Sequence, residues 1–249
     1  MNPAHRQAAH RFRLDWGPTG AQAVAAGAEV AVVVDVLSFT TTLTVAVERG
    51  ITVLPFAWKD GRAVAYADEH DATLAVGRLE ARQLGGDAVS LSPADLSTVT
   101  GVERLVLPSP NGSTICAALA DSGSTVVGAC LRNRSAVARH LEGARTVAVV
   151  AAGERWPDGS LRPCAEDLWG AGAVLAALVD LGADDLSPEA RLAEAAYRAV
   201  EPGLPDALAA CAGGLELGAI GFGADVEVAA RTDVTEVVPV LGDAGFRAA

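Results

Sequence analysis

The stretch VAVVVDVLSFTTTLTVAVE, residues 30–48, is the most informative part of the chain for its fold class. Its first five residues are apolar and mostly β-branched, which is typical of a strand buried on both faces of a sheet. Asp35 follows directly, and residues 40–49 then read as a helix. A buried strand, a polar turn and a helix in succession are the repeating unit of an α/β sheet.

The same succession recurs along the chain. We expect further strands at 51–56, 73–76, 104–107, 125–128, 146–150, 226–229 and 236–241. We expect helices at 61–69, 113–119, 134–141, 165–181, 187–200 and 204–218, with irregular sequence at 78–100 and a loop at 152–163. This alternation predicts an α/β fold, a layered αβα sandwich with a mixed, largely parallel sheet.

The predicted elements follow one another without a linker-like stretch. Residues 1–249 are therefore expected to form a single domain. Residues 1–28, a polar lead followed by Ala-rich sequence, are expected to be a peripheral N-terminal segment of that domain. Ser187 followed by Pro188 is a typical helix start, with the serine as N-cap.

Composition and charge exclude several classes of protein. Because 51% of the 249 residues are hydrophobic and recur along the whole length, the chain is not intrinsically disordered. The net charge is −12 and no basic tract occurs, so we expect neither nucleic acid nor an anionic membrane as a partner. No apolar stretch is long enough for a membrane span, and residues 1–20 contain no secretory signal. A cytoplasmic protein is expected, and a homodimer is left open.

The cysteines and histidines match no metal or redox motif. They are scattered along the chain, and no histidine has a cysteine or carboxylate at metal-ligand spacing. We expect buried thiols and surface histidines. The residues concerned are Cys116, Cys130, Cys164, Cys211, His5, His10, His70 and His140.

Polar residues follow the first predicted strand. In open α/β sheets, ligands bind outside the carboxyl ends of the strands. Asp35 stands at such an end, where a carboxylate suits a divalent cation, because burying it unpaired is costly. Ser38 and Thr40 open the next helix, where hydroxyls and free N–H groups suit an anion. The alternative is that these hydroxyls only cap the helix and pack.

A second anion site is predicted after the strand at 104–107. The turn contains Asn111 and Gly112, and Ser113 then begins a helix. It is not a Walker loop, because it has no Gly-Lys pair. A capped turn without a ligand is the alternative.

Two further strand ends carry charged or amide side chains. Arg132, Asn133 and Arg134 follow the strand at 125–128 and could hold a phosphate or carboxylate, or could be solvated charges. Glu166 and Asp167 begin the helix that follows the strand at 146–150. They either complement the helix dipole or supply further carboxylates to a metal held by Asp35.

Taken together, these groups indicate one kind of chemistry. Carboxylates, amides, hydroxyls and arginines fit metal-assisted phosphoryl transfer to water. The sequence has no nucleophile elbow and no evident Cys–His or Ser–His pairing. A metal-activated water and a carboxylate nucleophile both remain open, with Asp35 as the candidate for the latter.

An ordered set of motifs resembles the 2-phosphosulfolactate phosphatase family. The resemblance covers about residues 28–241. The matching segments are Val33-Val34-Asp35-Val36-Leu37-Ser38-Phe39-Thr40-Thr41-Thr42, Leu91-Ser92-Pro93, Pro110-Asn111-Gly112-Ser113, Arg132-Asn133-Arg134, Ala152-Gly153-Glu154, Ala165-Glu166-Asp167, Gly170-Ala171-Gly172, Gly221-Phe222-Gly223-Ala224-Asp225-Val226-Glu227 and Val238-Pro239.

The resemblance implies an α/β layered fold and a Mg²⁺-dependent phosphatase. Such an enzyme converts 2-phosphosulfolactate to sulfolactate and phosphate, an early step of coenzyme M biosynthesis. With the strand-end positions it gives one set of expected roles. These are catalysis by Asp35, Asn111 and Asn133, metal binding by Asp35, Glu166 and Asp167, and binding of the small anionic substrate by Ser38, Thr40, Ser113, Arg132 and Arg134.

Two positions depart from the family pattern. Gly77-Arg78 stands where a Gly-Glu pair is expected, and Leu91 stands where an Asn is expected before Ser-Pro. They leave two alternatives open, a phosphatase for a different phospho-hydroxy acid and a catalytically inactive anion-binding α/β protein. An unrelated phosphatase fold would usually carry a second Asp two residues after the first, where this chain has Leu37.

Overall fold

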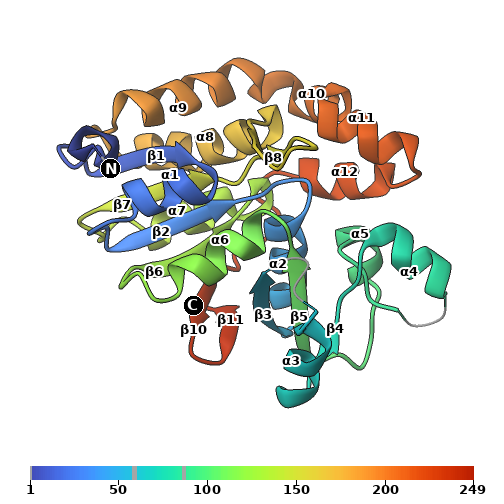
Figure 1. Cartoon of the computed structure of the whole chain (residues 1–249). Helices are drawn as coiled ribbons and strands as arrows, with labels where there is room; N and C mark the ends of the chain where they lie inside the picture. Colours follow the sequence, from blue (N-terminus) through green and yellow to red (C-terminus); the bar gives the residue numbers. More distant parts are fainter. Residues whose placement is uncertain (1, 58–60, 86–87) are drawn as a thin grey trace.

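A computed structural model describes residues 2–57, 61–85 and 88–249, and its centre is one large sheet (Figure 1). Within these residues the sheet has nine strands in the order β1-β7-β2-β6-β10-β11-β3-β5-β4. The strands are β1 (Phe12–Trp16), β2 (Val30–Val34), β3 (Thr52–Ala57), β4 (Thr73–Leu74), β5 (Arg104–Ser109), β6 (Thr125–Ala129), β7 (Val147–Ala151), β10 (Pro239–Gly242) and β11 (Gly245–Ala248).

Helices cover both faces of this sheet. They are α1 (Gly17–Val24), α2 (Phe39–Glu48), α3 (Ala63–Glu69), α4 (Arg78–Leu84), α5 (Pro93–Leu96), α6 (Gly112–Leu119), α7 (Arg134–His140), α8 (Ala165–Asp180), α9 (Pro188–Val200), α10 (Leu204–Ala210), α11 (Ala212–Ala219) and α12 (Gly223–Ala230). The predicted layered α/β fold with a mixed, largely parallel sheet is confirmed.

The sheet consists of two parallel blocks joined by a hairpin. The block β1-β7-β2-β6 and the block β3-β5-β4 each contain only parallel pairs. Antiparallel β10 and β11 lie between them, each joined to its neighbouring block by a single residue pair, Val240 with Val127 and Phe246 with Val53. Figure 1 shows the two blocks running in clearly different directions, so the sheet turns at this hairpin.

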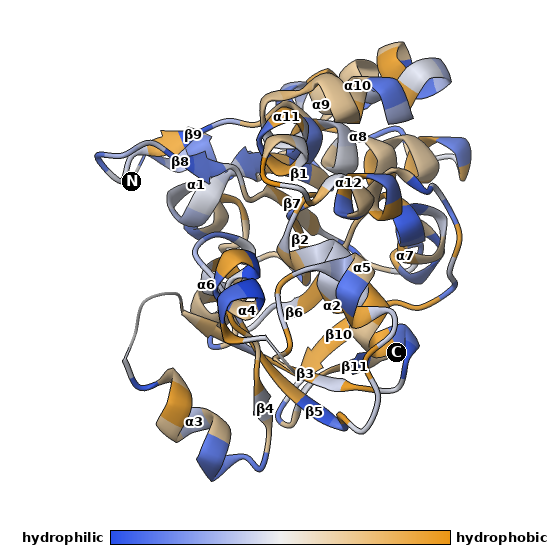
Figure 2. Ribbon diagram, turned by 90° about the vertical axis from the view of Figure 1, so that its right-hand side faces the viewer, coloured by the Kyte–Doolittle hydropathy of each residue, from blue (hydrophilic) through white to orange (hydrophobic). Residues whose placement is uncertain are grey.

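The alternation of side chains along β2 explains why this strand is apolar throughout. Val32 and Val34 belong to a core that includes residues of α7, α8 and α9. Ala31 and Val33 face the opposite core, which includes residues of α1, α2 and α6. Since successive residues of a strand point to opposite faces, covering both faces requires an unbroken apolar run. Figure 2 shows strands β3, β5 and β10 mainly in hydrophobic colours, while the helices mix hydrophobic and hydrophilic residues.

The N-terminal segment is less peripheral than the sequence predicts. Residues 12–16 form edge strand β1, which pairs with β7 from Phe12–Val147 to Trp16–Ala151. Phe12 and Leu14 are buried in the core. This part of the segment therefore contributes an edge strand and core side chains to the fold. A strand of five residues after a polar lead has a weak local signal, and pairing with β7 supplies its backbone partners.

Residues 226–229 are helical, so the predicted strand there is wrong. They lie in α12, where Val226 and Ala229 are buried at helical spacing. β-branched residues favour strands only weakly, and burial of one helix face overrides that preference.

Other differences between the predicted and observed elements are smaller. Residues 78–100 contain α4 and α5, residues 204–218 divide into α10 and α11 at Cys211, and β8 (Glu154–Arg155) pairs with β9 (Leu161–Arg162) inside the expected loop.

Several smaller expectations are confirmed. Ser187 is the N-cap of α9, because its side chain accepts a hydrogen bond from the Ala190 N–H. The cysteines are buried free thiols. His5 and His140 are exposed, and His10 and His70 are partly exposed. Within the described ranges no helix has both the length and the apolar character that crossing a bilayer requires.

Candidate functional site

A cavity of about 350 Å³ lies at the carboxyl ends of β2 and β7. It is lined by six carboxylic acids and two arginines, and backbone turns and apolar residues complete its wall. The charged residues are Asp35, Glu80, Glu154, Glu166, Asp167, Glu216, Arg78 and Arg162. An excess of acids in one cavity favours a cation together with an anionic ligand.

Asp35 is buried at the end of β2, with its Oδ2 atom 2.9 Å from the backbone N–H of Gly112, which donates to it. This bond ties the β2 end to the first residue of α6. Burial raises the pKa of Asp35 from its ordinary 3.8 to about 7, the Gly112 bond opposes that shift and nearby Glu154 adds to it. Asp35 is therefore a carboxyl group whose charge costs free energy unless a cation offsets it.

Asp167 connects the ends of two neighbouring strands. Its Oδ1 accepts from the Val36 N–H at 2.8 Å, and its Oδ2 accepts from the Gly153 N–H at 2.8 Å. Val36 directly follows Asp35, so the two acids lie side by side. Burial, and then the charges of Asp35 and Glu166, raise the pKa of Asp167 well above its ordinary value.

Glu166 completes the group of buried acids. It is 4% exposed and lines the same cavity from the first turn of α8. A Cβ on Gly213 of α11 would lie 2.5 Å from its Oε1 atom, so the missing side chain at 213 leaves room for this carboxyl group. The structure thus brings together all three acids that the sequence assigned to a metal.

The buried acids fit a Mg²⁺ ion held by two carboxylates, but not one held by three or more protein side chains. In the described part of the chain, no group of three or more His, Cys, Asp or Glu side chains has the geometry to hold one metal ion. Mg²⁺ is usually held by one or two carboxylates, with waters and substrate phosphate oxygens completing its shell. Asp35 and Asp167, buried and mutually repulsive, fit that smaller protein contribution.

Of the predicted substrate-binding hydroxyls, only Ser38 lines the cavity. The Thr40 hydroxyl donates to the Asp35 carbonyl at 2.8 Å and accepts from the Asp35 N–H at 2.9 Å. The Ser113 hydroxyl in the same way joins the carbonyl and N–H of Phe56. Thr40 and Ser113 therefore hold the backbone, and neither lines the cavity where substrate contact was expected. Both have a backbone partner within reach in the fold that the sequence could not indicate.

Asn111 lies beside the cavity without lining it. It precedes Gly112, the donor to Asp35, and it is the N-cap of α6 with 5% exposure. Its backbone carbonyl accepts from Ile115. The turn predicted after β5 therefore contributes through its backbone.

Asn133 and Arg132 are not at the cavity. Asn133 is fully buried, accepts from the Cys130 N–H and donates to the carbonyls of Gly128 and Val237. Arg132 pairs with Glu48 at 3.0 Å. The structure gives both residues partners within the fold and places neither at the cavity, because Asn133 bonds with Val237 of the C-terminal segment and Arg132 pairs with Glu48 at the end of α2.

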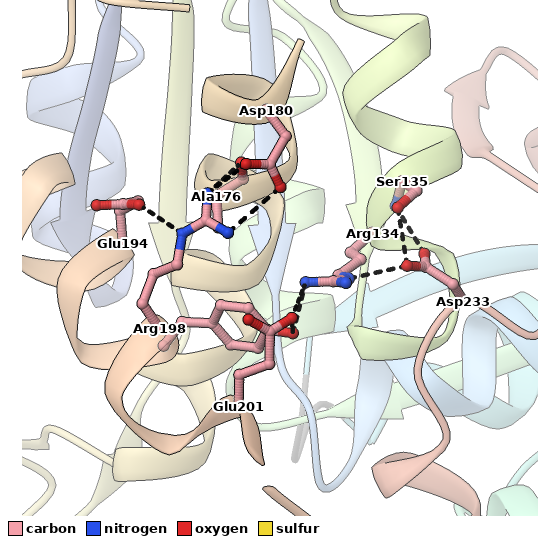
Figure 3. A network of polar contacts seen from close by, with 9 residues as sticks. Arg134, Ser135, Ala176, Asp180, Glu194, Arg198, Glu201 and Asp233 are labelled. Atoms are coloured by element: carbon pink, nitrogen blue, oxygen red, sulfur yellow. Dashed lines mark hydrogen bonds and ion pairs between the residues drawn. The ribbon is translucent and has the colours of Figure 1, made fainter. Parts of the chain in front are cut away.

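Arg134 is occupied in a separate ion-pair network, which Figure 3 shows. Its Nε atom lies 2.9 Å from Asp233 Oδ2, and its Nη1 atom lies 3.2 Å from Glu201 Oε1. Asp233 also accepts from Ser135. Arg134 therefore joins α7 to the end of α9 and to the C-terminal segment, and it does not line the cavity where substrate contact was expected.

Replacing Asn133 with Ala is expected to lower the free energy of unfolding by about 2–4 kcal/mol, because buried backbone groups lose their partners. The kcat/KM of the folded fraction should stay near that of wild type. Urea unfolding and phosphate release measure the two effects. Gln83→Ala, at an exposed amide of α4, is the control and should cost less than about 0.5 kcal/mol. A stable but inactive Asn133→Ala protein would return Asn133 to the active site.

The sequence-based site set omitted both arginines of the cavity. Arg78 follows Gly77 shortly after β4, so the rule that ligands gather at strand ends could have found it. Arg162 and Glu154 are cross-strand partners in the β8–β9 hairpin. The sequence of this loop is rich in turn residues and gave no indication that Glu154 and Arg162 would pair.

Comparison with known proteins gives a consistent result. The family model for 2-phosphosulpholactate phosphatase matches residues 19–244. A Deinococcus radiodurans protein named probable 2-phosphosulfolactate phosphatase is 31% identical over 218 residues, 86% of this chain and 88% of the relative. A protein of the same name from Thermus thermophilus is 32% identical over 218 residues, 86% and 88% of the two chains.

A third relative extends the comparison. The 2-phosphosulfolactate phosphatase of Methanothermobacter thermautotrophicus is 31% identical over 224 residues, 87% of this chain and 88% of that protein. The family match therefore covers β2, β7 and the helices that carry the buried acids. The chain belongs to the 2-phosphosulpholactate phosphatase family.

Proposed function

We propose that this chain is a phosphatase that hydrolyses 2-phosphosulfolactate to sulfolactate and phosphate. The observation that carries the proposal is the group of buried acids Asp35, Glu166 and Asp167 at one cavity, in a chain of this family. Their mutual repulsion is a cost to the folded protein, and acids kept together at such a cost are typical of a site that works with a cation.

We propose that the cation is Mg²⁺, held by Asp35 and Asp167 with Glu166 beside them. When bound, Mg²⁺ would offset the charge of the phosphate and of the group that leaves. The hydrogen bonds from Gly112 to Asp35 and from Val36 and Gly153 to Asp167 fix the two carboxylates. Because these hydrogen bonds already hold the carboxylates in place, the side chains need not reorganise when the substrate binds.

The remaining groups of the cavity would orient the substrate. Ser38 faces the cavity at the start of α2 and has no hydrogen bond through its hydroxyl among the described residues. It can donate to a phosphate oxygen. Arg78 and Arg162 supply positive charge to an anionic substrate.

Hydrolysis breaks the bond between phosphorus and the ester oxygen. Water contributes the new oxygen on phosphorus, and the released hydroxyl group of sulfolactate takes a proton. Asp35 is placed either to accept a proton from the attacking water or to attack phosphorus itself. Both routes need its carboxylate. A cytoplasmic enzyme acting early in coenzyme M biosynthesis is the setting that we propose for this reaction.

The test measures phosphate release from 2-phosphosulfolactate with Mg²⁺, with a chelator, and after Mg²⁺ is restored. Chelation is expected to lower kcat/KM by about 100-fold or more, since a cation supplies several kcal/mol of charge stabilisation. An unchanged rate in chelator would overturn the magnesium assignment. If no phosphomonoester in a panel that includes phospholactate is hydrolysed, the inactive anion-binding alternative is the correct one.

A further inference from the structure

Arg78 stands on the wall of the cavity and is held in place by a buried ion pair. Its Nε atom donates to Asp225 Oδ2 at 2.6 Å, and its Nη2 atom donates to the Leu37 carbonyl at 3.0 Å. Its side chain is 11% exposed and that of Asp225 is 2% exposed. The guanidinium group is therefore fixed on one side by α12 and on the other by the loop that follows β2.

Asp225 is itself fixed, although no step of the proposed hydrolysis uses it. Its Oδ1 atom accepts from the Ser92 hydroxyl and from the Ala94 N–H. Residues from α4, α5 and α12 thus meet at one carboxylate. Burying such an ion pair gains little stability, because both charges lose their hydration. The buried pair is explained if Asp225 orients the guanidinium group of Arg78.

The position of Arg78 relative to the acids is defined by the loop after β2. Asp167 accepts from the N–H of Val36, and Arg78 donates to the carbonyl of Leu37, the next residue. Burial raises the pKa of Asp35, and the nearby positive charge of Arg78 is a minor influence that opposes this rise. The arginine and the acids therefore flank one short loop and line the same cavity, so one small molecule in that cavity can meet both.

Arg78 still has donors to offer. A guanidinium group has five N–H donors, and the contacts described use only those on Nε and one on Nη2. The others have no partner among the described residues, and Arg78 lines the cavity. Arg162, the other arginine there, sits on the β8–β9 hairpin, where its guanidinium lies 5.7 Å from the ring centre of Trp156. Arg78 is thus the better pre-organised of the two.

We propose that Arg78, positioned by Asp225, binds the second anionic group that the substrate carries beside its phosphate, and so makes the enzyme select acidic phosphomonoesters. The second group is the carboxylate or the sulfonate, which a guanidinium recognises through the same pair of N–H donors. This inference rests on the proposed function of the cavity. Arg78 touches the substrate, and Asp225 is a positioning residue.

The test compares kcat/KM on a set of matched substrates. These are 2-phosphosulfolactate, phospholactate with only the carboxylate, 1-sulfopropan-2-yl phosphate with only the sulfonate, and isopropyl phosphate with neither. Arg78→Gln is expected to lower kcat/KM about 100-fold on 2-phosphosulfolactate, mainly through KM, and by less than about threefold on isopropyl phosphate. The single-anion substrate that shows the loss identifies the group bound.

Three further variants separate recognition from structure. Asp225→Asn should shift substrate preference in the same direction by about tenfold, and Arg78→Lys should restore part of it. Arg82→Gln is the matched control, one turn along α4. Arg82 donates to the Ile220 carbonyl and lies 4.3 Å from the ring centre of Phe222, but it does not line the cavity. The substrate preference of the Arg82→Gln variant should stay within about twofold of that of wild type.

A binding measurement makes the inference independent of turnover. Calorimetry should show that Arg78→Gln weakens sulfolactate binding by about 100-fold and leaves inorganic phosphate binding nearly unchanged. If wild type hydrolyses no phosphomonoester, the proposed function fails, while this measurement still tests the role of Arg78. Equal losses on acidic and neutral substrates, or unchanged sulfolactate binding, would overturn the inference. If Arg78→Gln does not fold, Arg78→Lys and Asp225→Asn decide the outcome by the same ratios.

Discussion

Replacing Asp35 with Asn is expected to lower kcat/KM on 2-phosphosulfolactate by about 1000-fold or more in the presence of Mg²⁺. The substitution keeps the size of the side chain and one oxygen to accept from the Gly112 N–H. It removes the charge on which both proposed routes depend. Phosphate release under saturating Mg²⁺ measures the effect.

Asp15→Asn is the matched control for this substitution. Asp15 lies in β1 of the same sheet, where its Oδ1 atom accepts from the Trp16 N–H, and it does not line the cavity. Its kcat/KM should stay within about threefold of wild type. An Asp35→Asn enzyme that keeps more than about a tenth of wild-type activity would contradict the central role of this carboxylate.

The same variant should also change how stability depends on pH. Because burial raises the pKa of Asp35 from 3.8 to about 7, the folded protein holds a proton that the unfolded chain has already released between these values. The free energy of unfolding therefore falls as the pH rises through this window. In chelator, Asp35→Asn should have a higher Tm than wild type at pH 8 and a similar Tm at pH 4. A lower Tm at both values would contradict the electrostatic reason.

Replacing Gly172 with Ala is expected to destabilise the protein strongly. A Cβ at this position would lie 2.0 Å from the carbonyl oxygen of Ala193 and 2.8 Å from the Cβ of Tyr197, so α8 and α9 would have to separate. Overpacking at a backbone contact should cost about 3 kcal/mol or more. For a chain of this length the Tm should fall by roughly 6–12 °C, which calorimetry measures.

Gly218→Ala supplies the control for the helix change itself. Gly218 also lies in a helix, α11, but a Cβ there meets no atom within 4 Å. Alanine favours helices over glycine, so this variant should be as stable as wild type or more stable, by up to about 1 kcal/mol. If the two variants unfold alike, the close approach of α8 and α9 is not the reason for glycine at 172.

Local patterns were sufficient for the centre of the fold. The apolar run of β2 and the acid that ends it predicted both a buried strand and a carboxylate at its end. Glu166 and Asp167, at the start of α8, were predicted in the same way. These residues lie where the sequence placed them because side-chain periodicity and the geometry of parallel strands act over short segments.

Long-range contacts explain why other expected site residues do not reach the cavity. Asn133 follows β6 as a ligand-binding side chain would, yet its amide bonds with Val237 more than a hundred residues further on. Arg134 is likewise taken by Asp233 and Glu201. A strand-end position shows that a polar side chain is available there. It does not show whether a distant segment of the chain has already satisfied it.

The cavity depends both on local sequence patterns and on long-range contacts. The sequence predicts the positions of its acids, because each strand–turn–helix unit by itself places a carboxylate near the carboxyl end of its strand. The position of its arginine is not predicted in this way, since Arg78 is oriented only where α12 brings Asp225 against α4 and α5. Periodicity establishes which residues reach the sheet edge. Packing of segments far apart in the chain establishes which of them keep free donors and acceptors for a substrate, because each buried polar group bonds with whatever partner the fold brings to it.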